Sequence, residues 1–266
     1  MARRKNTNRV AITPANAEQE FERELEVFRT EAEGAAQFFY AWLAVHAAAG
    51  DDKDIHRLLN TAPLFWNTAL GALQSATFVT LGRIFDSDSA HNLSRLLRMA
   101  QDHPQIFSKT ALGRRKQGTS ATPPSWLNDY LRDAYVPKVG DFRRLRAHVG
   151  KRRKTYEDKY RDLRHKIFAH KGTSDPAVIT ALFAKTNIRE LQRMLVFLGS
   201  LYEALWQLFM NGRKPSLRPR RYSVRSMRER PSPHAKSAAV HERILHEAGR
   251  FLTDASRALP PAQGRR

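Results

Sequence analysis

The chain has 266 residues, of which 46 are Lys or Arg, 26 are Asp or Glu and none is Cys. It is long enough to bury a sizeable core, as one large domain or as one domain with an appendage. The lack of Cys excludes disulfides and thiolate metal sites and fits a reducing cytosol, so we expect a cytoplasmic protein. The sequence has no apolar stretch of the roughly 20 residues that a membrane span needs, so we expect no membrane partner.

The formal net charge of +20 is unevenly distributed. Residues 213–266 contain 14 Lys or Arg against 4 Asp or Glu, and residues 138–171 contain 13 against 4. Clustered cations attract polyanions by releasing condensed counterions, so nucleic acid is the favoured partner. The alternatives are a solvated basic face that keeps the protein soluble and a tail that is attracted to anionic lipid.

The first part of the chain has the apolar periodicity of long helices. Apolar side chains recur at three- and four-residue steps from Pro14 to about Gly50. A second long helix is expected to begin at Pro63, because Pro is tolerated in the first turn, and to end at residues 86–89. A shorter helix is expected over about residues 93–101.

The middle of the chain is predicted as a loop and two helices. Residues 113–124 have the composition of an exposed loop, and a short helix is expected over residues 124–134. One long helix is then predicted from about Asp141 to Lys171, with a bend at Gly150.

The last long helix has clear start and stop signals. Residues 172–186 are predicted to form a connector with a short helix over residues 177–183. Asn187, with Glu190 three residues later, is typical of a capping box, and an apolar helix follows that ends at Gly212.

No stretch alternates long enough to predict a β-strand. We therefore expect an all-α protein, an up-down helical bundle of about four long helices with additional short helices. The predicted division is a basic N-terminal arm (1–13), a helical domain (14–212) and a basic Pro- and Arg-rich tail (213–266). The tail can form an amphipathic helix over residues 234–259, and we interpret the tail as separable from the helical domain.

The candidate site lies in one stretch, Arg164-His165-Lys166-Ile167-Phe168-Ala169-His170. A guanidinium that is always charged lies here beside imidazoles that can hold or release a proton near neutral pH. This combination suits chemistry on a phosphodiester. Gly172 follows, a residue type that often ends helices in the left-handed conformation.

The same stretch resembles the motif of the HEPN superfamily, which is an Arg, a polar residue, a short apolar run and a His. With the long helix that precedes it, from residue 65 to Asp86, the chain looks most like the AbiU-like abortive-infection branch, over roughly residues 20–212. The polar position is often Asn in that family, whereas His165 occupies it here.

The resemblance implies a helical, commonly dimeric, metal-independent endoribonuclease that needs no cofactor. It implies catalytic roles for Arg164, His165 and His170, with RNA as substrate and a cognate antitoxin or regulatory protein as a further partner. It also implies a role as a toxin or as an effector of abortive infection and antiviral defence. We expect flanking phosphates to be bound by nearby cations: Arg161, Lys166, Lys171, Arg152 and Arg153.

A straight α-helix would not bring the two ends of the motif together. Six residues separate Arg164 from His170, by about 9 Å of rise and about 240° of rotation. Either the helix unwinds near residues 168–172 or the working pair is assembled between two subunits of a symmetric dimer. The apolar width of the last helix is a second argument for a dimer, and its residues are Leu198, Leu201, Tyr202, Leu205, Trp206 and Phe209.

Two other classes of function remain open. The protein could be a non-catalytic helical module that binds nucleic acid or a partner protein. It could also be an antitoxin-like or scaffold protein in which the bundle only dimerises. In either case Arg164 would pair with a neighbouring acid such as Glu157, and His170 would only cap a helix.

Overall fold

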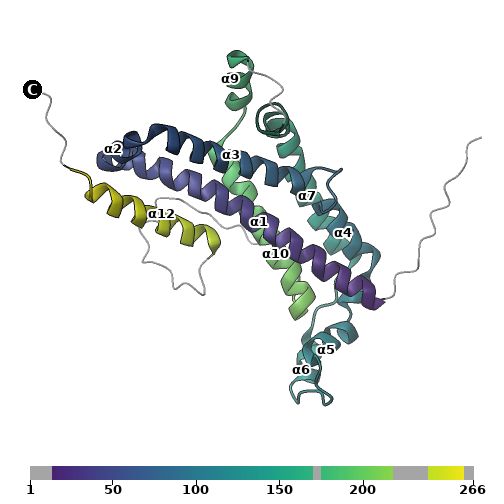
Figure 1. Cartoon of the computed structure of the whole chain (residues 1–266). Coiled ribbons are helices and arrows are strands. Elements are labelled where there is room, and N and C mark those ends of the chain that lie inside the picture. Colours follow the sequence, from purple (N-terminus) through teal and green to yellow (C-terminus); the bar gives the residue numbers. More distant parts are fainter. Residues whose placement is uncertain (1–13, 170–174, 218–238, 261–266) are drawn as a thin grey trace, which may run out of the picture.

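The computed structural model describes residues 14–169, 175–217 and 239–260, and within these ranges all regular elements are helices. The predicted all-α fold is confirmed. Four helices are long, as expected: α1 (Pro14–Asp51), α3 (Pro63–Phe85), α7 (Val139–Lys159) and α10 (Ile188–Asn211). Figure 1 shows α1 crossing the middle of the molecule, and it packs against α3, α10 and α12 (Val240–Arg257).

The first long helices begin and end where the sequence signals place them, but a short helix between them was not predicted. α2 (Lys53–Thr61) starts because the carboxylate of Asp52 accepts hydrogen bonds from the N–H groups of Asp54 (2.8 Å) and Ile55 (3.3 Å). Ile55 is buried and anchors the helix. After α3, the helix α4 (Leu93–Asp102) occupies the predicted position.

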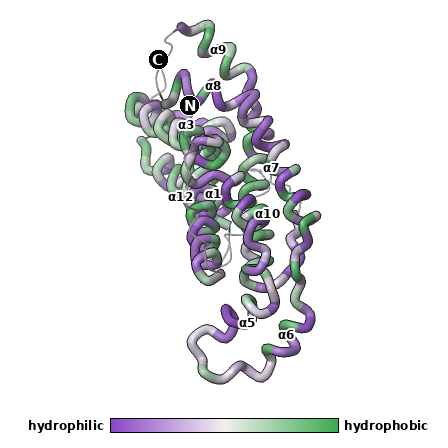
Figure 2. Tube along the Cα trace, turned by 90° about the vertical axis from the view of Figure 1, so that its right-hand side faces the viewer, coloured by the Kyte–Doolittle hydropathy of each residue, from purple (hydrophilic) through white to green (hydrophobic). Residues whose placement is uncertain are grey.

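The prediction of a loop over residues 113–124 is wrong for its first part. After a 3₁₀ turn, η1 (Pro104–Phe107), the helix α5 (Lys109–Gln117) runs into the predicted loop. It is capped by the hydroxyl of Ser108 and ends at Gly118, which has φ of 60°. α6 (Leu127–Asp133) follows, and both views show α5 and α6 projecting at one end of the molecule (Figures 1 and 2).

The long helix predicted from Asp141 to Lys171 is interrupted. α7 ends at Lys159, a three-residue helix α8 (Arg161–Leu163) follows, and residues Arg164–Ala169 form a π-helix, η2. The break is at Tyr160 rather than at Gly150. Its buried ring stacks on Phe78 (centroids 5.9 Å apart), and its hydroxyl donates to the carbonyl of Asn187 (3.2 Å). This burial raises the pKa of Tyr160 to about 12.

Two helices complete the domain. α9 (Pro176–Ala184) matches the predicted short helix, and α10 is capped by Asn187, whose side chain accepts from the N–H groups of Arg189 and Glu190. The carboxylate of Glu190 accepts instead from Lys159 (2.8 Å), so it ties α10 to the end of α7. α10 ends at Gly212 in the left-handed conformation (φ 56°).

α10 lies in the core, and this overturns one argument for a dimer. Most of the apolar residues that the sequence left without a partner are buried inside the subunit: Leu198, Leu201, Leu205 and Phe209. α1, η1 and α5 pack on this helix. The apolar width of α10 therefore serves the fold of one chain and gives no support to dimerisation.

α12 falls within the range predicted for the tail helix, but it packs against α1 and α2. Its Leu252 joins Val45, Ala48 and Ile55 in a small buried cluster. The rings of His241 and Tyr40 lie 5.1 Å apart. Residues 240–257 therefore cover part of the helical domain, which differs from the interpretation of a separable tail.

A network at the start of α7 fixes that helix to its surroundings. The buried carboxylate of Asp141 accepts from the hydroxyl of Tyr135 (2.6 Å) and the N–H of Lys138 (2.8 Å), and it pairs with Arg144. Burial favours the neutral acid, but the hydrogen bonds and the nearby cation outweigh it and lower the pKa of Asp141 below its ordinary value.

Asp141→Asn is expected to lower the free energy of unfolding by about 1–3 kcal/mol at neutral pH, because hydrogen bonds to a charged acceptor are lost. The pKa of this group is lower in the folded than in the unfolded state. Its contribution is therefore present above the unfolded pKa and is lost as the pH falls through the folded pKa. Urea unfolding at a series of pH values measures this, with exposed Asp133→Asn as the control. A difference from wild type that does not shrink in acid would contradict the assignment.

Candidate active site

The first residues of the motif lie against the C-terminal half of α3. η2, which begins at Arg164, packs on α3 and α8. α8 and α9 are at the opposite end of the molecule from α5 and α6 (Figure 2). His170 and Lys171 lie outside the described residues, so the structure places only Arg164 and His165 of the three predicted catalytic residues.

Arg164 forms an ion pair with Asp86, the residue directly after α3. Its Nη2 lies 2.6 Å from Oδ2 of Asp86, and the two side chains are only 16% and 19% exposed. The carboxylate of Asp86 lies at the C-terminal end of α3, where the negative end of the helix dipole repels an anion. The positive charge of the Arg164 guanidinium compensates for this repulsion. The acid suggested from sequence, Glu157, pairs with Arg153 instead (2.8 Å).

Gly82, one turn before Asp86, makes room for the guanidinium. A Cβ at this position would lie 2.2 Å from Nη1 of Arg164 and 2.8 Å from its Cζ. Any larger residue would push the side chain away from Asp86. The hydrogen-bond donor Nε–H of Arg164 is buried and has no acceptor among the described residues.

His165 is held by the same guanidinium. Nη2 of Arg164 lies 2.7 Å from Nε2 of His165. A guanidinium can only donate, so Nε2 must accept, and the imidazole is then neutral with its proton on Nδ1. The contact with Arg164 therefore fixes the orientation of the His165 ring and favours its neutral form.

Tyr156 lies close to the ion pair. Its buried ring stacks on Phe85, with centroids 5.4 Å apart. Burial raises the pKa of the Tyr156 hydroxyl, the charge of Asp86 raises it further, and the charge of Arg164 opposes both. The buried Tyr156 thus lies close enough to the Asp86–Arg164 pair for both charges to act on its hydroxyl.

The π-helical segment changes the geometric premise of the sequence argument. In η2 the backbone hydrogen bonds join residues five apart, so each turn holds more residues than in an α-helix. The rotation of about 240° assumed a straight α-helix from Arg164 to His170. That assumption does not hold for residues Arg164–Ala169, and His170 itself lies outside the described residues, so the choice between an unwound helix end and a composite site stays a prediction.

The cations predicted to bind flanking phosphates differ in their surroundings. Arg161 is exposed, and Lys166 lies 3.7 Å from the carboxylate of Asp162. The guanidinium of Arg152 lies over the ring of Phe197, 5.6 Å from its centroid. Arg153 is occupied by its ion pair with Glu157, so Arg161 is the most accessible of the four that the structure describes.

Sequence reasoning did not assign Asp86, Gly82 or Tyr156 to the site. A Gly inside an apolar helix and an acid at its end are weak signals of a packing or functional role. Neither signal identifies a partner 78 or more residues away in the chain. The contact follows only from the packing of η2 on α3.

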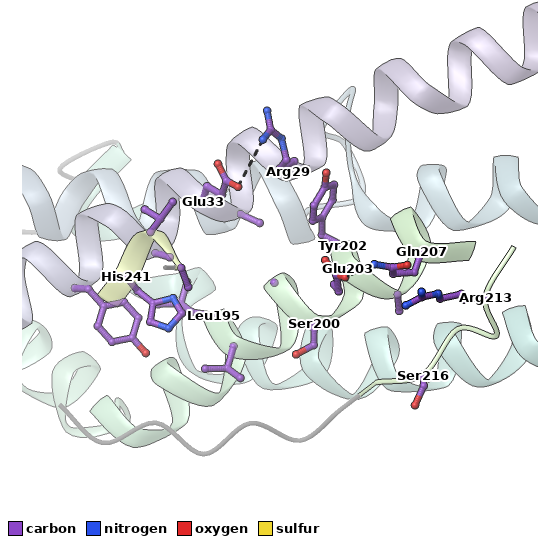
Figure 3. Close-up of a pocket in the computed structure, with 18 of the residues that line it drawn as sticks. Arg29, Glu33, Leu195, Ser200, Tyr202, Glu203, Gln207, Arg213, Ser216 and His241 are labelled. Carbon is purple, nitrogen blue, oxygen red and sulfur yellow. Dashed lines mark hydrogen bonds and ion pairs between the residues drawn. The ribbon is translucent and has the colours of Figure 1, made fainter. Parts of the chain in front are cut away.

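One cavity lies away from the motif. It has a volume of about 390 Å³ between α1, α10 and the start of α12, and Figure 3 shows Arg29 and Glu33 on one wall and His241 on another. Arg29 is already paired with Glu26, and Glu33 is 3.9 Å away. The cavity contains no motif residue, so we do not assign the chemistry to it.

A smaller cavity of about 240 Å³ lies at Tyr160, between α1, α3 and the start of α10. Phe78 and Tyr160 line it, each four residues before a residue of the ion-pair site, Gly82 and Arg164 respectively. Its walls also include Trp42. This cavity therefore borders the break at Tyr160 between α7 and α8, and it also contains no motif residue.

Among the described residues, no group of three or more His, Asp or Glu side chains is placed to hold a metal ion. None of the helices that the structure describes combines the length and apolar character needed to cross a bilayer.

Comparison with known proteins gives one family. The family model described as AbiU2, of the HEPN type, matches residues 18–229. No curated protein and no solved structure gives a significant match. The matched range includes Asp86, the motif and α10, and it ends before α12.

Gly82→Ala and Gly71→Ala make a matched pair on α3. A methyl group at Gly82 must displace Arg164, so we expect Gly82→Ala to destabilise the protein by about 1–3 kcal/mol. A methyl group at Gly71 meets nothing within 4 Å, so Gly71→Ala should stabilise the helix by about 0.5–1 kcal/mol. Chemical denaturation measures both, and equal effects of the two substitutions would show that Gly82 makes no room for Arg164.

Proposed function

Because the chain belongs to the AbiU2 family of HEPN proteins, we propose that it is a metal-independent endoribonuclease whose centre is Arg164, His165 and His170. The observation that carries the proposal is the placement of Arg164. Its guanidinium is fixed by Asp86 in the space left by Gly82 and contacts His165, the next residue of the motif.

The reaction uses the 2′-hydroxyl of the substrate as nucleophile. The 2′-oxygen forms a bond to phosphorus while the bond from phosphorus to the 5′-oxygen breaks. The 2′-hydroxyl proton passes to a base, and the leaving 5′-oxygen takes up a proton. The products are a 2′,3′-cyclic phosphate and a 5′-hydroxyl.

Arg164 would stabilise the negative charge that develops on the phosphorane. Only Nη2 is used in the described contacts with Asp86 and His165, which leaves the donors on Nη1 and Nε. The buried Nε–H has no acceptor among the described residues, and a phosphate oxygen would satisfy it. A fixed guanidinium of this kind provides charge stabilisation without reorganisation.

The two histidines take different roles in the proposal. His170 is assigned proton transfer from the family motif, a contribution of about 10²–10⁴ in rate. His165 accepts from Arg164 through Nε2, which supports a positioning role toward the guanidinium and the phosphate. Arg161, Lys166, Lys171, Arg152 and Arg153 remain proposed contacts for flanking phosphates.

The biological setting follows from the family and stays part of the proposal. We place the protein in the cytoplasm as a toxin or an effector of abortive infection and antiviral defence, acting as a homodimer and restrained by an antitoxin or regulatory protein. Light scattering at micromolar concentration tests the dimer, and a monomeric enzyme that cleaves RNA would contradict it.

One observation favours a second candidate, a non-catalytic helical module that binds nucleic acid or protein. The ion pair between Arg164 and Asp86 joins η2 to α3, so Arg164 also has a structural task. Tight RNA binding by wild-type protein without any cleavage would favour this alternative.

Purified protein incubated with total RNA or with tRNA tests the proposed function. We expect cleavage that a chelator does not inhibit and products with cyclic phosphate ends. His170→Ala should abolish cleavage but retain RNA binding. Arg164→Ala and Arg164→Lys should both be nearly inactive, because a point charge cannot replace the planar fork. His165→Asn should keep more activity than His165→Ala.

Asp86 and Asp88 provide a matched control for the placement of Arg164. Asp86→Asn removes the anion that holds the guanidinium and should lower kcat by at least about tenfold, whereas Asp88→Asn, two residues on and exposed, should leave kcat unchanged. Cleavage that persists in His170→Ala, or that requires a divalent ion, would falsify the mechanism.

A further inference from the structure

Three exposed cations of α7 differ from the other cations of this helix. Arg143, Lys151 and Lys154 form no ion pair with any residue that the structure describes. The remaining basic side chains of α7 each have a partner within the fold: Arg144 with Asp141, Arg146 with Gln101, Arg152 with Phe197, Arg153 with Glu157 and Lys159 with Glu190.

The three cations form a row on the outward face of α7. At about 100° per residue they fall within about 80° of one another. The buried residues of the helix point the opposite way, and they are Phe142, Leu145, Val149 and Tyr156. Figures 1 and 2 both show α7 at one side of the molecule and α12 at the other.

The space between the cations is open. Ala147 and Gly150 lie on the same outward face, and a Cβ at Gly150 would meet nothing within 4 Å. A polymer can therefore approach the helix closely between Arg143 and Lys151. Two acidic residues lie on or beside this face, near the C-terminal end of α7: Asp158 is exposed, and Glu157 is paired with Arg153.

The row leads toward the candidate site. Arg161, which is exposed and forms no ion pair with a described residue, follows α7 and precedes Arg164 by three residues. Arg143 and Lys154 are 11 residues apart, or about 16 Å along the helix. A stacked nucleic-acid strand advances about 3.4 Å per nucleotide, so the row spans about five phosphates.

We propose that the outward face of α7 binds the sugar–phosphate backbone of single-stranded RNA and leads the strand to Arg164. This inference rests on the proposed function, and it names the substrate class and the path on which the substrate lies. One row of cations matches the one row of phosphates of a single strand. We call the row of Arg143, Lys151 and Lys154 the α7 track. Its contacts go to phosphates and not to bases, so binding along the track does not depend on the RNA sequence.

A triple variant tests the track with a substrate that cannot be cut. A fluorescent 2′-O-methyl oligonucleotide of about 12 nucleotides lacks the nucleophile, so anisotropy reports binding alone. For a single strand, each lost phosphate contact reduces the slope of log Kd against log salt by about 0.7. Replacement of Arg143, Lys151 and Lys154 by Ala should therefore reduce the slope of log Kd against log salt by about 2 and weaken binding at least about tenfold at low salt.

The matched control removes the same charge elsewhere. Lys53, Arg243 and Arg250 are exposed on α2 and α12, form no ion pair with a described residue, and lie away from α7 (Figure 1). Their replacement by Ala should leave the affinity within about twofold of wild type. Equal weakening by both triple variants would mean that net charge alone attracts RNA and would overturn the track.

Two further measurements bear on the same inference. Asp158→Asn removes the anion from the row and should tighten binding by about two- to fivefold.

A duplex of the same length should bind more weakly than the single strand, and a duplex that binds as tightly with the same salt slope would overturn the single-strand assignment. Because binding is measured without cleavage, a wild-type protein that binds but does not cut would contradict the proposed function and leave the track intact.

Discussion

The ion pair between Arg164 and Asp86 imposes the constraint on which the rest of the site depends. Asp86 lies at the end of α3, and Arg164 begins a π-helix some 78 residues later. Gly82 must be small for the two charges to meet, and the buried Tyr156 lies close to both. A local change in either helix therefore moves the guanidinium, even where the motif itself is unchanged.

This constraint has an energetic side. Partly buried ion pairs contribute little net stability, because desolvation offsets most of the attraction, whereas removal of one partner leaves an uncompensated charge. A solvent-exposed salt bridge would also join α3 to η2, but loss of one of its partners would cost little, because water would solvate the remaining charge. The buried version fixes direction: it holds Nη2 toward Asp86 and His165 and leaves the other donors of Arg164 available.

Local chemistry made much of the fold predictable from the sequence. Pro63, Asn187 and Gly212 each mark a helix end for a local reason: Pro lacks an N–H that the first turn does not use, the side chain of Asn187 caps free N–H groups, and Gly212 takes the left-handed conformation. The break at Tyr160 was not predictable, since it depends on a buried ring that reaches the cap of another helix. For the same reason the sequence suggested Arg164 and His165 as candidates but not Asp86, the partner of Arg164, because this contact forms only when distant elements pack.

The packing of α12 on α1 has a consequence for the order in which the protein can be completed. These helices are among the last and the first described elements of the chain, separated by about 190 residues. During synthesis the N-terminal helix emerges first, at a rate of roughly 5–20 residues per second. The surface of α1 and α2 that holds Leu252 must therefore stay uncovered for roughly ten seconds or more after it leaves the ribosome. The emergence of α12 from the ribosome, rather than the folding of the preceding helices, sets the moment at which this part of the core closes.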